Sequence, residues 1–225
     1  MRLCMFHPSE HPLERGWVGR IDGDRVVQLA AQTLQSFFLG GGGAREHAEY
    51  ALAEIVLLAP VLHPPTVRIF DGQESFAFAN AAAAGGPGLR VPARGSPLLL
   101  FPRLAAIVGA GGRIGGYTLL AEWRADGVPA PKDRDFALGL GPAVCTPDEF
   151  EPAAAVIAVR PGGAEQPRAE APPFDWDEAA AFAAAGTTLR PGDVLAGPCA
   201  APLRPAAGPV ELELSGIGVL VQTVA

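Results

Sequence analysis

Leu104-Ala105-Ala106-Ile107-Val108 is a short apolar run bounded by Pro102 and Gly109, and it is the stretch that decides the fold. A short run of this kind, closed by a proline and a glycine, predicts a buried strand. Gly115-Gly116-Tyr117-Thr118-Leu119-Leu120 follows closely and predicts a second strand. The centre of the chain is therefore expected to be β-structure.

Further short strands are expected on both sides of this centre. Residues 1–30 predict a small β unit, in which residues 17–21 and 26–29 flank a turn at Asp22-Gly23. Strands are also expected at 156–159, 211–214 and 219–221, and helices at 30–39, 45–56 and 177–185, the last capped by Asp175 or Asp177. With 28 glycines and 23 prolines to make turns, the pattern predicts a β-rich α+β fold.

An extended link over 57–62, which ends at His63-Pro64-Pro65, divides the predicted fold. Residues 1–56 are expected to form a small N-terminal domain, and residues 57–225 are expected to form the main domain. A loop rich in proline, glycine and alanine is expected at 161–173.

The composition limits the partners. The net charge is −7 and like charges form no block, which disfavours nucleic acid because phosphate binding needs clustered Lys and Arg. No apolar run is long enough to span a membrane, and the N-terminus lacks the apolar region of a signal peptide. Cys4, Cys145 and Cys199 are too few and too widely spaced to predict a disulfide framework or a zinc site. We expect a cytoplasmic protein that takes a small-molecule substrate.

Four segments in order resemble the fumarylacetoacetate hydrolase (FAH) family over residues 57–225. They are Leu58-Ala59-Pro60-Val61 with Pro64-Pro65-Thr66-Val67-Arg68, Leu104-Ala105-Ala106-Ile107-Val108-Gly109 with Gly116-Tyr117-Thr118 and Trp123, Lys132-Asp133-Arg134-Asp135-Phe136 with Leu140-Gly141-Pro142 and Thr146-Pro147-Asp148-Glu149, and Leu189-Arg190-Pro191-Gly192-Asp193-Val194-Leu195 with Gly216-Ile217-Gly218-Val219-Leu220. Each motif alone is weak, and the resemblance rests on their common order and spacing. It implies an FAH-type mixed β-roll with a small N-terminal β unit, which agrees with the predicted strands.

The resemblance also implies a metal site. Enzymes of this family hold a divalent metal, usually Mg²⁺, with two glutamates on one strand and an aspartate after the Gly-Tyr-Thr strand. The metal polarises a dicarbonyl or keto-acid oxygen as a Lewis acid. The first two positions fall at Phe101 and Arg103, which cannot ligate a cation, and the third falls at Glu122. We therefore expect no bound metal and no other cofactor.

Other positions of the family pattern are altered too. The catalytic histidine of the family falls at Phe76, so the base that would activate water is missing. Arg124 stands in the stretch after the third metal ligand, and Cys199 stands in the substrate-binding turn, where a thiol is a weaker hydrogen-bonding group than a hydroxyl. The expected substrate contacts are Phe76, Phe101, Arg103, Tyr117, Arg124 and Cys199.

Lys132 is the only lysine among 17 basic residues, and it matches the family's active-site lysine. A partly buried ammonium can titrate downward and serve as an acid, or it can bind an oxyanion. We predict Lys132 and Glu122 as the catalytic pair. If both face one cavity, their charged groups should lie within about 4–6 Å of each other.

Three functions fit these residues. The first is a metal-independent lyase, decarboxylase, isomerase or cyclase that uses Lys132 on a dicarbonyl, keto or polyketide-like substrate, as in secondary metabolism. The second is a non-catalytic scaffold or ligand-binding subunit that pairs with an active relative. The third is a retained C–C hydrolase with a rebuilt metal site, whose ligands would be Glu122, Asp126, Asp133 and Asp135. The resemblance implies a homodimer, or a heterodimer with a relative.

Overall fold

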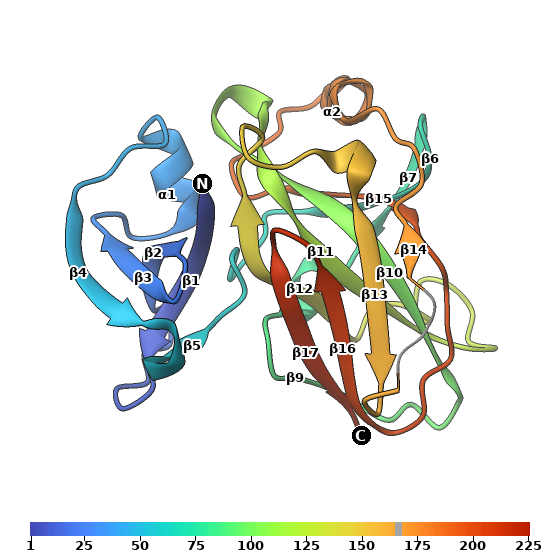
Figure 1. Ribbon diagram of the computed structural model, residues 1–225. Coiled ribbons are helices and arrows are strands. Elements are labelled where there is room, and N and C mark those ends of the chain that lie inside the picture. The colour runs from blue at the N-terminus through green and yellow to red at the C-terminus, as the bar shows by residue number, and fades with distance from the viewer. Residues whose placement is uncertain (165–167) are drawn as a thin grey trace.

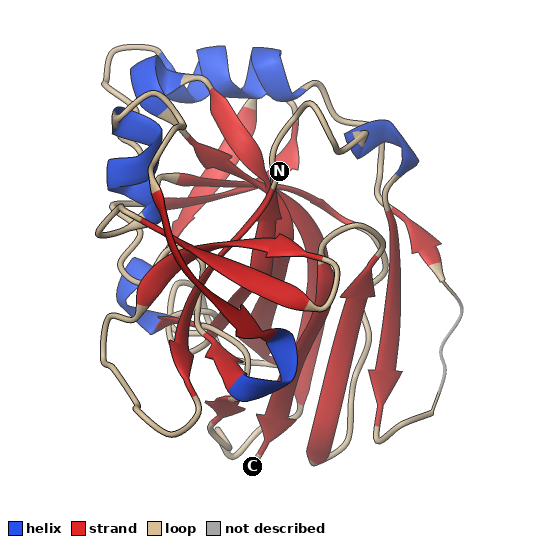
Figure 2. Cartoon of the chain, turned by 60° about the vertical axis from the view of Figure 1, so that its left-hand side comes forward, coloured by secondary structure: helices blue, strands red, loops and turns tan. Residues whose placement is uncertain are grey.

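The computed structural model describes residues 1–164 and 168–225 (Figure 1). Strands are the main regular structure, and the helices are short and lie at the edges of the sheets (Figure 2). The loop expected at 161–173 includes residues 165–167, which lie outside the described residues. None of the described helices is long and apolar enough to cross a bilayer.

The larger of two sheets contains twelve strands. They are β1 (Arg2–Pro8), β2 (Trp17–Asp22), β3 (Arg25–Leu29), β4 (Glu46–Ala51), β5 (Ile55–Leu57), β6 (Val67–Gly72), β7 (Ser75–Ala79), β8 (Ala84–Gly85), β10 (Leu98–Val108), β11 (Ile114–Ala125), β12 (Leu138–Cys145) and β15 (Val194–Cys199). The order across the sheet is β4-β3-β2-β1-β12-β11-β10-β15-β6-β7, with β5 beside β1 and β8 beside β12.

The smaller sheet has five strands in the order β14-β13-β16-β17-β9. Their bounds are β9 (Leu89–Val91), β13 (Val156–Pro161), β14 (Ala169–Glu170), β16 (Gly208–Leu214) and β17 (Gly218–Val224). The described helices are α1 (Leu34–Leu39) and α2 (Trp176–Ala184), with 3₁₀ turns at Leu52–Glu54, Ala81–Ala83, Ala110–Gly112 and Pro152–Ala154. The strands expected at 156–159, 211–214 and 219–221 are confirmed as parts of β13, β16 and β17.

β10 and β11 form the long central hairpin, which confirms the two strands predicted at 104–108 and 115–120. Successive side chains of a strand point to opposite faces. On β10, Leu104 and Ala106 pack into one core cluster, whereas Ala105 and Ile107 pack into another. Because both faces of the hairpin are covered, its apolar run is unbroken.

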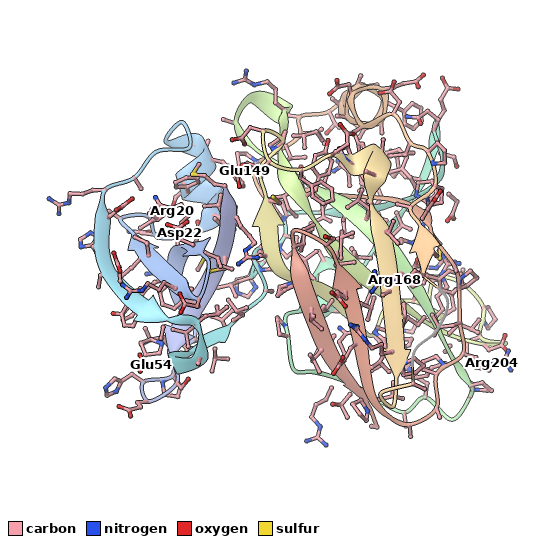
Figure 3. All side chains as sticks on the ribbon, viewed as in Figure 1. Arg20, Asp22, Glu54, Glu149, Arg168 and Arg204 are labelled. Atoms are coloured by element: carbon pink, nitrogen blue, oxygen red, sulfur yellow. The ribbon has the colours of Figure 1, made fainter. Side chains whose placement is uncertain are left out.

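The helix predicted at 45–56 is wrong, because this segment forms β4, a 3₁₀ turn and β5. β4 pairs with β3, and its carboxylates at Glu46 and Glu49 accept hydrogen bonds from Arg20 (2.6 Å) and Arg25 (2.7 Å). Figure 3 labels Arg20 and Asp22 among these N-terminal strands. Cross-strand pairing of this kind outweighs the helical spacing of the local apolar residues.

The other two predicted helices are confirmed with shifted bounds. α1 begins only at Leu34, because the Thr33 side chain accepts from the Ser36 N–H and caps it there. α2 begins after Asp175, whose carboxylate accepts from the Glu178 N–H at 2.9 Å. An oxygen-bearing residue at this position satisfies a free N–H of the first helical turn.

The N-terminal strands share a core with the rest of the chain. Leu3 of β1 pairs with Val144 of β12, so the larger sheet continues from one part into the other. Leu3 and Met5 are buried in the same cluster as Leu140 and Val144. In Figure 1 the N-terminal strands lie at the left, with β12 as the nearest strand of the remainder. The division at residue 56 stays a prediction.

Candidate functional site

The central hairpin positions the residues that the family pattern singles out. Phe101 of β10 pairs with Glu122 of β11, and Arg103 pairs with Leu120. Phe101, Arg103, Glu122 and Arg124 project from the same face of the hairpin, because they occupy matching positions in the strand alternation.

Glu122 is a buried carboxylate with both oxygens engaged. The side chain has 0% exposure. Its Oε2 accepts from the Arg103 Nε at 2.8 Å, and its Oε1 accepts from the Arg124 Nε at 2.6 Å. The Arg134 Nη1 lies 3.7 Å from Oε1. Burial of a carboxylate is tolerated only when paired charges and hydrogen bonds replace water, and here guanidinium groups do so.

The Arg103 guanidinium joins four strands. At 1% side-chain exposure, it donates from Nη1 to the carbonyl oxygens of Phe70 (3.0 Å) and Gly197 (2.9 Å). Its Nη2 donates to the Asp71 carboxylate at 3.1 Å and lies 2.8 Å from Glu122 Oε2. Since these partners belong to β6, β11 and β15, Arg103 holds neighbouring strands to β10.

Arg124 covers the outer side of this ion-pair network. Its guanidinium carbon lies 4.2 Å from the centre of the Phe101 ring, which is a cation–π distance. Its Nη2 atom is buried and has no hydrogen-bond partner among the described residues. Arg134 in turn pairs with Asp133, with 3.1 Å between Nη2 and Oδ2.

These residues do not fit a divalent metal ion. Glu122 is the one carboxylate left at the positions that the resemblance assigns to metal ligands, and both its oxygens are bound by arginines. Within residues 1–164 and 168–225, no three His, Cys, Asp or Glu side chains are grouped so that they could hold a metal. Mg²⁺ and Mn²⁺ need several hard oxygen ligands, and guanidinium charges repel them. The rebuilt cage expected from Asp126, Asp133 and Asp135 does not form.

Among the described ion pairs, Lys132 does not pair with Glu122, and the catalytic roles of the two residues stay a prediction. The Lys132 ammonium is exposed, at 69% of its side-chain surface, and it pairs with Asp135 in the same loop. Arg134, which lies two residues further on, points to Glu122 in its place. Both residues lie in a turn, where the Arg134 N–H bonds to the Pro131 carbonyl, and the motif itself does not show which of the two side chains points inward.

Tyr117 lies on the opposite face of the hairpin from Glu122, because its position in β11 has the other parity. Tyr117 and Glu122 therefore face opposite sides of the hairpin, and the six expected substrate contacts stay a prediction. Phe76 lies on β7, with its ring centre 5.2 Å from that of Phe70. Sequence reasoning missed the roles of Asp71, which lies outside the quoted motifs, and of Arg134, which stands in a motif where only Lys132 was singled out.

Cys199 lies beside Arg103 across the β10–β15 pair. Burial raises the pKa of its thiol to about 11, and Glu122 also raises it, whereas Arg103 lowers it. A thiol with this pKa is protonated at neutral pH and is a poor nucleophile. This agrees with a structural role for Cys199.

Comparisons with known proteins bear on the fold. No protein-family model matches the sequence, and no curated protein matches it. Among solved structures, the maleylpyruvate hydrolase from Sphingobium sp. SYK-6 is similar, with a TM-score of 0.81 and 22% identity over 100% of this chain and 99% of that one. The 5-carboxymethyl-2-hydroxymuconate delta-isomerase from Mycobacterium smegmatis has a TM-score of 0.77 and 20% identity, over 100% and 99% of the two chains.

The fumarylacetoacetate hydrolase from Exiguobacterium antarcticum is also similar, with a TM-score of 0.78 and 18% identity over 100% of this chain and 99% of that one. The chain is therefore a β-rich α+β protein that shares its fold with these hydrolases and isomerases. This is the FAH-type fold, as the sequence resemblance predicted. One structure of the Sphingobium hydrolase is a complex with manganese (II) ion and pyruvate.

Proposed function

We propose that this chain is a metal-independent, non-hydrolytic protein with the FAH-type fold, which serves as a ligand-binding or scaffold subunit. The observation that carries this proposal is the contact of Arg103 with Glu122, at 2.8 Å and fully buried. A guanidinium satisfies the carboxylate at a position where the resemblance implies a cation. The charges of this network already satisfy one another, so a substrate oxygen could bind there only by displacing one of the side chains.

The same contacts argue against the metal-independent enzyme that the sequence favoured. A general base must lie within reach of a substrate proton, and Glu122 is fully buried with both oxygens bound by guanidinium groups. An acid in a closed pocket must face that pocket, and the Lys132 ammonium is exposed and pairs with Asp135. Replacement of Lys132 by Met should therefore leave the melting temperature and any ligand binding unchanged.

The test is to rebuild the family's ligand pattern. We expect the melting temperature of the natural chain to be unaffected by Mn²⁺, while Mn²⁺ raises that of a Phe101→Glu/Arg103→Glu variant, because binding to the folded state stabilises it. A Phe101→Gln/Arg103→Gln variant is the matched control, since it has the same side-chain lengths and no added carboxylates. It should show no response to Mn²⁺.

Measurements on the natural chain test the proposal even if the variants fold poorly. Stoichiometric Mn²⁺ after dialysis, measured by elemental analysis, would contradict the proposal. Cleavage of maleylpyruvate by the natural chain in the presence of Mn²⁺ would contradict it as well.

A further inference from the structure

A recess of about 600 Å³ lies on the face of the central hairpin opposite Glu122. Leu104 and Tyr117 contribute to it from β10 and β11, and the segment 170–177, which leads into α2, encloses it together with the turn at Pro152–Ala154. Figure 1 shows α2 above the strands of the central hairpin. Glu122 and the arginines that contact it do not line it, whereas Gly197, whose carbonyl accepts from Arg103, does.

Aromatic rings meet at right angles in the recess. The Tyr117 and Trp176 ring centres are 5.4 Å apart with 72° between their planes. The Phe174 and Trp176 centres are 4.8 Å apart with 82° between their planes. Rings in such an arrangement present π faces in different directions, and a cation is attracted to such faces.

The charged residues that line the recess are all acidic. They are Glu151, Glu170, Asp175 and Asp177. No Lys, Arg or His contributes to the lining, and none of these carboxylates forms an ion pair with a described residue. Asp175 and Glu151 accept only backbone N–H groups, from Glu178 and Ala153. The lining therefore carries only negative charge, while Arg113 lines the adjoining hollow that shares Tyr117 and Asp177 with it.

Two polar groups in the aromatic walls have no partner. Tyr117 is 6% exposed and Trp176 is 7% exposed, and both line the recess. Neither the Tyr117 hydroxyl nor the Trp176 indole N–H makes a hydrogen bond to a residue within the described ranges. The two polar atoms are not among the fully buried atoms that lack a partner, so they reach the open space of the recess, where a ligand atom or water is their expected partner. Burial, with Asp177 and Glu151 adding to it, raises the pKa of Tyr117 to about 12, so the phenol stays neutral.

We propose that this recess binds a small organic ammonium ion, held by the Tyr117, Trp176 and Phe174 rings and by the surrounding carboxylates. A metal ion is the poorer occupant, because no three acidic side chains in the described chain are grouped to share one. An organic cation is larger, so it can contact separate carboxylates and several rings together. This inference names a ligand class for the binding role proposed above. Because the recess lies on the other face of the hairpin, the proposal for cation binding and the proposal for the Arg103–Glu122 network are tested separately.

Titration calorimetry on the full chain tests the proposal. Choline is the quaternary probe, spermidine is the primary and secondary amine probe, and the control ligand is the neutral isostere of choline with a tert-butyl group in place of the trimethylammonium group. We expect at least one of the two cations to bind and the neutral isostere to bind about tenfold more weakly or not at all. Stronger binding of choline would identify a quaternary site, and stronger binding of spermidine would identify an amine site.

Three variants locate the binding. Asp177→Asn removes one exposed carboxylate charge and should weaken cation binding by roughly three- to tenfold. Trp176→Phe removes the largest π face and the indole N–H and should weaken it by about tenfold. Glu10→Gln is the matched control, because it removes an equal charge on an exposed residue that is not part of the recess. It should leave binding unchanged.

The proposal is overturned if neither cation binds, or if the isostere binds as well as choline. It is also overturned if Glu10→Gln weakens binding as much as Asp177→Asn does, since that would indicate attraction to the overall negative charge. Thermal melts of each variant check folding, and Asp177→Asn carries the result alone if Trp176→Phe is unstable.

Discussion

At the scale of single residues, Arg103 of β10 and Glu122 of β11 form a buried ion pair across the central hairpin. Removal of one partner from a buried pair is costly, because the remaining charge stays away from water. We expect Arg103→Leu to lower the free energy of unfolding by about 3 kcal/mol, with Arg124 still contacting Glu122. Urea unfolding followed by fluorescence measures the change.

The double variant Arg103→Leu/Glu122→Leu is the control for this prediction. Because it leaves no uncompensated carboxylate, we expect it to be more stable than the single variant. An unchanged urea midpoint in Arg103→Leu would contradict the structural role of the pair.

Cys199 gives a pH-dependent prediction at the same scale. Burial raises the pKa of its thiol to about 11, from an ordinary value of 9.0. The folded pKa lies above the unfolded one, so the stability that the neutral thiol contributes is intact below about pH 9 and is lost as the pH rises through about 11. Alkylation of Cys199 by iodoacetamide, followed by mass spectrometry, should be slow at neutral pH. Rapid alkylation there would indicate an activated thiolate.

At the scale of the elements, close contacts between backbones fix how the loops meet. A Cβ atom on Gly86, between β8 and β9, would lie 2.2 Å from the Ala59 nitrogen and 2.7 Å from the Leu58 carbonyl carbon. Backbone cannot move aside as a flexible side chain can, so we expect Gly86→Ala to cost about 3 kcal/mol of stability, near the upper end for overpacking.

Gly88→Ala is the comparison for this substitution. Gly88 has a φ of +84° with no neighbour within 4 Å of the added Cβ, so only backbone strain of about 1 kcal/mol is expected. Thermal melts of the two variants rank the effects. Equal losses of melting temperature would mean that the contacts of the added Cβ with Leu58 and Ala59 do not determine the cost of the substitution at Gly86.

At the scale of the whole molecule, the N-terminal strands and the remainder are joined by a shared core. Leu3 and Met5 lie among the apolar residues of β12 and β6, with Val144 and Val67 in the same cluster. We therefore expect the chain 57–225 to expose apolar surface and aggregate, although the sequence suggests a boundary there. Sizing and dye binding of the truncated protein measure this. A soluble, cooperatively melting fragment would establish residues 57–225 as an independent domain.

The dimer implied by the resemblance also stays a prediction at this scale. β7 is one end of the larger sheet, and its Phe78 side chain is exposed. Light scattering on the purified chain at micromolar concentration gives the mass. We expect twice the mass of one chain, and a stable monomer would remove the support for pairing with a second copy.

The sequence by itself determined the local structure. The apolar runs at 104–108 and 115–120 gave the central strands, and Asp175 gave the start of α2. The order of the motifs predicted the FAH-type fold. These inferences succeed because strand alternation, helix capping and residue chemistry depend on neighbours in the chain.

Only the tertiary structure decided which side chains meet. It paired Glu122 with Arg103 and Arg124 and left Lys132 at the surface. It also made a strand of residues 46–51 and brought Tyr117 to Trp176, 59 positions along the chain. Such contacts follow from strand order and register, which are set by the summed burial of the whole sheet and have no local signal. The energy of a buried charge depends on those distant partners, and for that reason the sequence could name Glu122 but could not say what binds it.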